Sequence, residues 1–220
     1  QHGALFPLGK AGRQVELSCI FAVLDDAVCA ASKQEIIRRY YAALCDKRDG
    51  AENEGAIHKL DILMKQASLT PESRPVVPAA NEKAAKSDSP AAAIELPDGT
   101  IVTGKTSDLM GCASSLLLNA LKALAGLDDS LHLIAPEVIG PIQHLKVDHF
   151  GNRNPRLHTD EILIALSICA ATDPRAELAM EQLVKLRGCE AHSSVILSSV
   201  DEKIFKRLGV NLTCEPRYQG

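Results

Sequence analysis

Residues 94–107, IELPDGTIVTGKTS, carry the clearest signal of a β-sheet in this chain. Two short runs of apolar and β-branched residues, 94–96 and 100–103, flank Pro97-Asp98-Gly99, and this arrangement is typical of a β-hairpin. The rest of the chain alternates between strand and helix signals and ends in a strand, a helix and a strand. Such an ending implies a mixed or parallel sheet with helices on both faces. The sequence therefore predicts an α/β fold for this region.

Caps, turns and periodicity predict the elements after the hairpin. Strands are expected at 131–134, 195–197 and 210–213, and helices at 107–125, 160–171, 174–186 and 201–208. Pro136 opens a further helix, which Gly140-Pro141 should kink or restart. The helix at 160–171 is so apolar that we expect it to be buried on nearly all sides.

The chain before the hairpin is predicted to be helical. Residues 1–24 give no clean period, so no element is assigned to them, and a truncation or an artefact would explain them. Ser32 and Glu35 form a capping box, which predicts that a helix begins at Ser32. A second amphipathic helix is expected at 52–67.

A proline-containing connector separates the two regions. Residues 69–90 contain four prolines and at most a short helix at 79–86. We therefore expect a helical region with its linker over 25–88 and an α/β domain over 92–220.

Composition excludes several classes of protein. The chain has 220 residues and 46% hydrophobic residues, and no apolar run approaches the length of a membrane span. The net charge of −4 and the 3% aromatic content argue against a nucleic-acid binder. Seven cysteines without a C-x-x-C pair favour reduced thiols and a cytoplasmic location, and no signal peptide is expected. Because the chain does not begin with Met, we interpret it as a fragment of a longer protein.

Residues 99–106 match the phosphate-loop pattern G-x-x-x-x-G-K-T by letter. The hairpin interpretation is favoured, because the intervening residues are β-branched and Gly99 lies in a turn. A milder interpretation uses Gly104, Lys105, Thr106 and Ser107, where free N–H groups at a helix start and the lysine would bind an anion. The alternative is that Ser107 only caps a helix and Lys105 is solvated.

A second candidate site is the polar loop at 152–161, which leads into the apolar helix. Asn154 and Arg156 are candidate ligand-binding residues, because arginine recognises carboxylate or phosphate with two hydrogen bonds. His158 lies next to a helix N-terminus, where it should resist protonation and act as a neutral donor or base. The segment from Thr159 to Glu161 is better explained as a helix cap.

A third candidate site is the segment 187–194. Arg187 is a candidate anion ligand, and Cys189 with His192 would form a nucleophile–base pair or, together with Cys214 and His158, bind a metal. The alternative is that Cys189 is a small buried hydrophobic residue, and no metal site is assigned. Acidic residues outnumber basic ones over 92–220, so cationic loops there favour a small anionic ligand, provided that the loops converge on one rim of the sheet.

Several long segments resemble one bacterial family. The runs at 32–41, 94–107, 154–161, 186–192 and 208–216 are similar, in the same order, to the C-terminal half of the domain-of-unknown-function family eighteen-forty-six. Residues 1–24 look unlike that family. The resemblance implies that the partner of this chain is a missing N-terminal half. Some members carry the label of ATP-dependent peptidase, which the hairpin interpretation does not support.

The resemblance also implies a helical N-terminal region followed by a three-layer α/β/α sandwich with a mixed sheet, similar in topology to cytidine deaminases. Their zinc chemistry needs H-x-E and P-C-x-x-C. This chain offers His158-Thr-Asp160 and no P-C-x-x-C, so deaminase activity is not carried over.

Two hypotheses on function stand. The first is an enzyme or binder of a small anionic, nucleotide-like ligand, in which Lys105 and Arg156 neutralise the anion and His158 or His192 is the acid or base. The second is a structural or oligomerisation module whose helices pack against a second copy or the missing half. The sequence assigns no cofactor.

Overall fold

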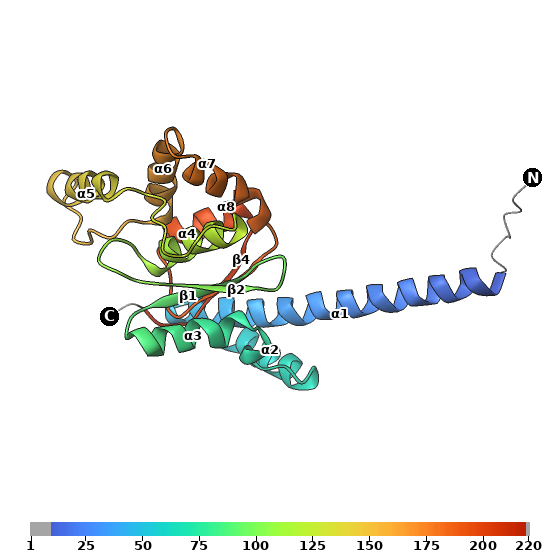
Figure 1. Cartoon of the computed structure of the whole chain (residues 1–220). Coiled ribbons are helices and arrows are strands. Elements are labelled where there is room, and N and C mark those ends of the chain that lie inside the picture. The colour runs from blue at the N-terminus through green and yellow to red at the C-terminus, as the bar shows by residue number, and fades with distance from the viewer. Residues whose placement is uncertain (1–9, 219–220) are drawn as a thin grey trace, which may run out of the picture.

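The computed structural model describes the backbone of residues 10–218 and the side chains of residues 28–218. It opens with α1 (Lys10–Arg48), a helix of 39 residues whose first part projects away from the rest of the molecule (Figure 1). The predicted helix start at Ser32 is therefore wrong, and α1 also covers residues 10–24, to which the sequence assigns no element, while residues 1–9 lie outside the described part of the chain. A capping box acts only where the chain before it is extended, and here Ala30 and Ala31, strong helix formers, continue the helix into Ser32.

Two further helices precede the sheet. The predicted second helix is confirmed as α2 (Glu54–Gln66). The connector is more ordered than predicted, since it contains the short 3-10 helix η1 (Pro71–Ser73) and α3 (Val76–Ser87). The prolines do not prevent α3, because Pro75 and Pro78 lie at its start, where no intrahelical N–H bond is lost. This helix packs directly on the sheet, and the division into domains stays a prediction.

The sheet has four strands in the order β2-β1-β3-β4. The hairpin is confirmed, with β1 (Ala91–Glu95) antiparallel to β2 (Ile101–Lys105) and Gly99 in the turn at φ 84°. β3 (Glu190–Ser193) is antiparallel to β1, and β4 (Asn211–Cys214) is parallel to β3. The predicted mixed sheet is therefore confirmed.

Helices cover both faces of this sheet, as the predicted sandwich requires (Figure 1). On one face lie α4 (Cys112–Leu124), α6 (Thr159–Ala170), α7 (Pro174–Glu181), the 3-10 helix η3 (Gln182–Leu186) and α8 (Ser199–Leu208). The main hydrophobic core is on this face, around Leu116, Leu121 and Phe205. The other face is covered by α3 and the end of α1. The likeness to cytidine deaminases stays a prediction.

Two predicted strands are wrong. Residues 131–134 bury Leu133 and Ile134 without forming a strand, because an apolar run of this length fits a buried loop as well as a strand. Residues 195–197 lie beyond the end of β3, and the strand occupies 190–193 instead. The predicted helix at 107–125 begins later, at Cys112, after a turn that Ser107 closes by accepting bonds from the N–H groups of Leu109 and Met110.

The predictions for two further helices, α5 and α6, are also corrected. α5 (Pro136–His144) runs through Pro141 without restarting and continues into the π-helix η2 (Leu145–His149). α6 is not buried on nearly all sides, because Ile164 and Ile168 are 60% and 57% exposed. Its apolar composition therefore leaves an uncovered apolar face. Among the helices of the described region, none combines the length and the hydropathy that a membrane span needs.

Candidate functional site

A small cleft lies where three helices begin. The ends of β2, β3 and β4 lie at the same edge of the sheet, next to the start of β1, and α4 and α8 begin just beyond it. The start of α6 joins them through the bridge between Met110 and Leu157. We call this cleft the helix-start cleft; its volume is about 150 Å³. Its lining residues are Gly111, Cys112, Ala113, Asn154, Arg156, Leu157, His158, Val195, Ile196, Leu197, Ser198 and Asp201.

His158 is held in this cleft by a buried carboxylate. Its Nδ1 lies 3.1 Å from Oδ2 of Asp201, and the Ser198 hydroxyl donates to the same oxygen at 2.7 Å. The other carboxylate oxygen accepts the N–H of Thr159 at 2.9 Å, at the start of α6. Asp201 is only 7% exposed, so its carboxylate fixes the imidazole ring and joins the starts of α6 and α8.

The charge of this pair differs from the sequence-based prediction. The hydrogen bond that His158 donates to Asp201 raises the pKa of His158 above its usual value, so the prediction that His158 resists protonation is wrong. Burial acts to raise the pKa of Asp201, but the hydrogen bonds from His158, Thr159 and Ser198 outweigh it and hold that pKa below its usual value. His158 therefore carries a proton more readily than a free histidine.

Arg156 contributes a second cation to the same cleft. Its Nε donates to the carbonyl of Ser107 at 2.8 Å, and its backbone N–H donates to Oδ1 of Asn154 at 3.1 Å. Among the side chains that the structure describes, none lies within hydrogen-bond distance of the two terminal nitrogens of this guanidinium. These nitrogens match a carboxylate or phosphate edge.

Cys112, at the start of α4, completes the wall of the cleft, and Thr106 caps that helix. The N–H of Cys112 donates to Oγ1 of Thr106 at 3.1 Å, so Thr106 satisfies the first N–H of this helix, as Ser107 was expected to do. Ala113 follows in the first turn of α4 and also lines the cleft. Burial raises the pKa of Cys112, so its thiol stays protonated and behaves as a small apolar group.

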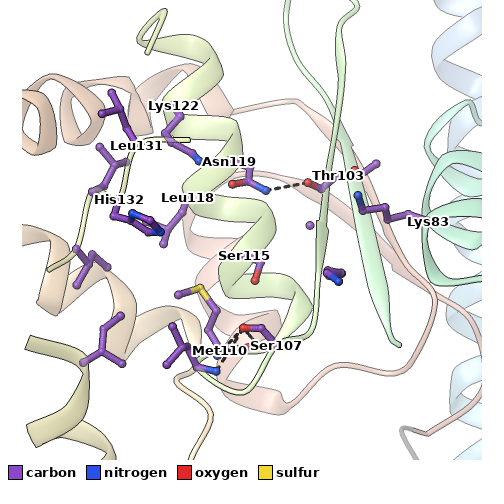
Figure 2. Close-up of a pocket in the computed structure, with 16 residues that line it drawn as sticks. Lys83, Thr103, Ser107, Met110, Ser115, Leu118, Asn119, Lys122, Leu131 and His132 are labelled. Atoms are coloured by element: carbon purple, nitrogen blue, oxygen red, sulfur yellow. Dashed lines mark hydrogen bonds between the residues drawn. The ribbon is translucent and has the colours of Figure 1, made fainter. Parts of the chain in front are cut away.

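Gly104, Lys105 and Ser107 line a second, larger cavity, which we call the β2-edge pocket (Figure 2). Gly104 is required there for packing, because a Cβ at this position would lie 2.2 Å from the backbone nitrogen of Leu116 on α4. Lys105 therefore lies in a different cavity from Arg156, although the segment 105–111 borders both.

His192 lies outside both cavities, on the opposite face of the sheet. It is fully buried, with Nδ1 2.8 Å from Oγ1 of Thr213 and Nε2 3.3 Å from Oε1 of Glu215. Its ring lies against that of Tyr41, 4.8 Å between centres. Burial lowers the pKa of His192 despite the nearby carboxylate. Its nitrogens are occupied, so the geometry gives it no access to a ligand.

Arg187 and Cys189 lie at the other end of β3, away from the helix-start cleft. Cys189 donates its thiol to the carbonyl of Lys185, and burial raises its pKa. The expectation that three cationic loops meet at one rim is therefore wrong: the loops with Ser107 and Arg156 meet, and the loop with Arg187 does not. In the part of the chain with described side chains, no group of three or more His, Cys, Asp or Glu residues has the geometry of a metal site.

Two residues that line the cleft, Asp201 and Ser198, are not among the predicted site residues. Asp201 and Ser198 were assigned only to a helix and to its preceding loop. The segment Ser198-Ser-Val-Asp201 has the S-x-x-D spacing of a capping box, which would have placed the helix start at Ser198, where α8 is indeed capped. No local signal connects Asp201 with His158, 43 residues away.

The fold and the site thus define a mixed α/β protein with a cleft at converging helix starts. A family model described as domain of unknown function DUF1846, C-terminal, matches residues 72–220, and its N-terminal counterpart matches residues 13–68. The chain belongs to the DUF1846 family. The match from residue 13 corrects, for residues 13–24, the expectation that residues 1–24 are unlike the family.

Curated relatives are similar over most of this chain. The UPF0371 protein cu0538 of Corynebacterium urealyticum is 53% identical over 197 residues, or 89% of this chain, and a UPF0371 protein of Streptococcus pyogenes is 50% identical over 90% of it. The chain spans 40% of the length of each of these relatives. None of these names states an activity.

Proposed function

We propose that the helix-start cleft binds a small anionic ligand and that His158 exchanges a proton with it. The observation that carries the proposal is the His158–Asp201 pair beside Arg156 in one cleft. Both cations there are available: the guanidinium has two nitrogens without partners in the described region, and only Nδ1 of His158 is engaged by Asp201. The proposal keeps Arg156 and His158 from the sequence analysis and omits His192.

The size of the cleft limits the ligand. Sites for drug-sized molecules usually have volumes of about 300–1,000 Å³. At about 150 Å³ the helix-start cleft fits a carboxylate or phosphate group better than a whole nucleotide. The first turn of α4, at Cys112 and Ala113, lines the same cleft, and the N-terminus of a helix favours an anion.

His158 would act as the proton donor. Asp201 engages Nδ1, so Nε2 is left for the ligand, and the raised pKa keeps the ring protonated further toward neutral pH. A protonated ring both attracts the anion and supplies the proton. Binding should therefore strengthen as pH falls from 8 toward 6.

Titration calorimetry with inorganic phosphate and with AMP tests this proposal. We expect at least one of them to bind, more tightly at pH 6 than at pH 8, and Arg156→Ala and His158→Ala to weaken it about tenfold each. Arg207→Ala, an exposed arginine at the end of α8, is the matched control and should leave the affinity unchanged. Absence of binding by both anions, or equal affinity in the Arg156 variant, would contradict the proposal.

A second candidate function is an interaction module. The exposed side chains of Ile164 and Ile168 form an uncharged apolar strip on α6, which a second copy of the chain would cover. Analytical ultracentrifugation of the wild type and of the double variant Ile164→Glu, Ile168→Glu tests this. A dimer lost in the variant supports the module, and a monomeric wild type argues against it.

We also propose a cytoplasmic location and a contact between α1, α2 and the further chain that the longer relatives possess. The six cysteines with described side chains are all free, which suits a reducing compartment. Fractionation of cells that express the chain tests the location.

A further inference from the structure

The β2-edge pocket is a second cavity, with a volume of about 350 Å³, at the outer edge of the sheet. It lies between β2, α4, α5 and the segment 131–134, with α3 behind the strand (Figure 2). Its volume lies within the range of small-molecule sites. Its lining residues are Lys83, Thr103, Gly104, Lys105, Ser107, Leu109, Met110, Ser115, Leu118, Asn119, Lys122, Leu131, His132, Leu133, Ile134 and Ile139.

One half of the pocket is apolar. Leu118 on α4 and the buried residues Leu133, Ile134 and Ile139 face it, together with Met110 before α4. In the close-up, Leu118 and Met110 lie on the side of α4 away from Thr103 and Lys83 (Figure 2). This half suits a hydrocarbon or aromatic body.

The other half carries positive charge. Lys83 on α3 and Lys105 at the end of β2 line it, and neither side-chain ammonium has an ion pair or hydrogen bond with any described residue. Lys122 differs, because it donates to the backbone and side chain of Asp129. No Asp or Glu is among the lining residues, so the two free lysines have no carboxylate partner within the pocket.

The edge strand adds backbone donors on the same side. In an antiparallel pair, only every second residue of a strand forms backbone hydrogen bonds with its neighbour. The N–H of Leu96 donates to the carbonyl of Thr100, and the N–H of Thr106 donates to the carbonyl of Pro90, so Thr100, Thr106 and the alternate residues between them bond β1. Thr103 and Lys105 are the other residues, so their N–H groups point away from the sheet, toward its free edge. β2 is an edge strand, and no other described strand pairs with it there.

We infer that the β2-edge pocket binds a small amphipathic carboxylate of the medium-chain fatty acid class. The carboxylate would lie between Lys83, Lys105 and the free N–H groups of β2, and the chain would lie on Leu118 and the residues of 131–134. This site is separate from the helix-start cleft and requires no activity there.

An extended peptide added to the edge of β2 is a less suitable occupant. A paired peptide would need the carbonyl of Thr103, but that oxygen already accepts the side-chain amide of Asn119 at 3.0 Å (Figure 2). The apolar half also lies across α4 from the strand rather than along it. The geometry therefore favours a short ligand with one charged end.

Calorimetric titration of the full chain with decanoate and with decanol tests the inference. We expect decanoate to bind more tightly than decanol, and the double variant Lys83→Ala, Lys105→Ala to weaken decanoate about tenfold with little effect on decanol. Lys86→Ala, an exposed lysine on α3, is the matched control and should behave as the wild type. No binding of decanoate to the wild type, or equal affinity in the double lysine variant, would overturn the inference.

A second variant tests the apolar half. Ser115→Trp should fill the pocket and abolish binding of both probes, and since the chain contains no other Trp, its emission reports whether the new side chain is buried in a folded protein. A folded variant that still binds decanoate would contradict the assignment. Arg156→Ala should leave decanoate binding unchanged; its loss there would assign the fatty acid to the helix-start cleft instead.

Discussion

The two faces of the sheet are held in different ways. On the α4 face, Ala92 and Ile94 of β1 and Ala191 of β3 pack into an apolar core with Leu116. On the face covered by α1 and α3, the same strands present Glu190 and His192 to charged and polar partners. Apolar burial drives the first contact, whereas the second combines a small apolar cluster of Val76, Ala80 and Ala93 with a hydrogen-bond network.

The face of the sheet that α1 and α3 cover, which we call the polar face, contains a fully buried arginine. Arg74 pairs with Glu190 and donates to the carbonyls of Ala191 and Asn211 at 2.8 and 2.9 Å. Arg38 of α1 pairs with the other oxygen of Glu190 at 2.7 Å. This network fixes α1 and the start of α3 against β3.

The two histidines differ in a way that bears on function. His192 on the polar face has both nitrogens engaged and a lowered pKa, whereas His158 at the helix-start cleft has one nitrogen engaged and a raised pKa. Because nearly all of its hydrogen-bonding groups have partners, the polar face has a structural role rather than a binding role. The cations that stay available lie along the edge where β2 ends.

Gly104→Ala should destabilise the protein most, because it disrupts the packing of α4 on the sheet. The new Cβ would lie 2.2 Å from the backbone of Leu116, so α4 must move off β2. We expect a loss of at least about 4 kcal/mol in the free energy of unfolding, measured by urea denaturation. Gly55→Ala in α2, where nothing lies within 4 Å, is the control and should be neutral or slightly stabilising. A wild-type midpoint for Gly104→Ala would show that α4 does not pack as described.

Arg74→Met should have the next largest effect on the free energy of unfolding, because it removes the central residue of the hydrogen-bond network on the polar face. It leaves Glu190 with Arg38 as its remaining cation and deprives two buried carbonyls of their donor. We expect a loss of about 3 kcal/mol in the same measurement. Arg39→Met removes an exposed pair with Glu35 and should cost less than about 1 kcal/mol. Equal effects of the two substitutions would contradict the special role of the buried network.

Glu215→Gln tests how much an ionised carboxylate on the polar face contributes to stability at acid pH. The hydrogen bond from His192 and a second from Asn81 lower the pKa of Glu215 to about 2, so its stabilising effect is present above the unfolded value of 4.5 and is lost as pH falls from there toward 2. The wild type should therefore lose stability over this range more steeply than Glu215→Gln. Melting temperatures at pH 5, 4 and 3 measure the difference, and parallel profiles would argue against the pairing.

Asp201→Asn should have the smallest effect on stability but the clearest effect on His158. It removes the bond that raises the pKa of His158, so this pKa should fall in an NMR titration of the imidazole while that of His192 stays unchanged. The raised pKa stabilises the fold fully below 6.5, and that contribution is lost as pH rises through the folded pKa. This loss should be weaker in the variant. An unchanged titration of His158 would contradict the hydrogen bond on which the proposed function depends.

Local signals predicted much of the fold. The Pro97-Asp98-Gly99 turn, the helix that Asp173 caps and the helix that ends at Gly209 depend on a few neighbouring residues, and each is confirmed. Predictions failed where the same local sequence pattern is compatible with two different structures. The capping box at Ser32 lies inside a continuous helix, and the apolar run at 131–134 is a buried loop.

The candidate site was predicted in part. Asn154, Arg156 and His158 were found because polar loops before buried helices often carry function. The partner that sets the charge of His158, Asp201, was not found because it lies 43 residues further along the chain. His192 and Cys189 were included because residue type alone does not show which face of a strand, or which end of it, a residue occupies.

The hairpin, most of the helices and the mixed sheet could be predicted from the amino-acid sequence, because turn chemistry and hydrophobic period act over a few residues. Only the tertiary structure decided which polar groups are satisfied and which are free. That outcome depends on contacts between distant segments, such as α6 with α8 or β2 with α4, and hydrogen bonds require their donors and acceptors to be brought within about 3 Å of each other.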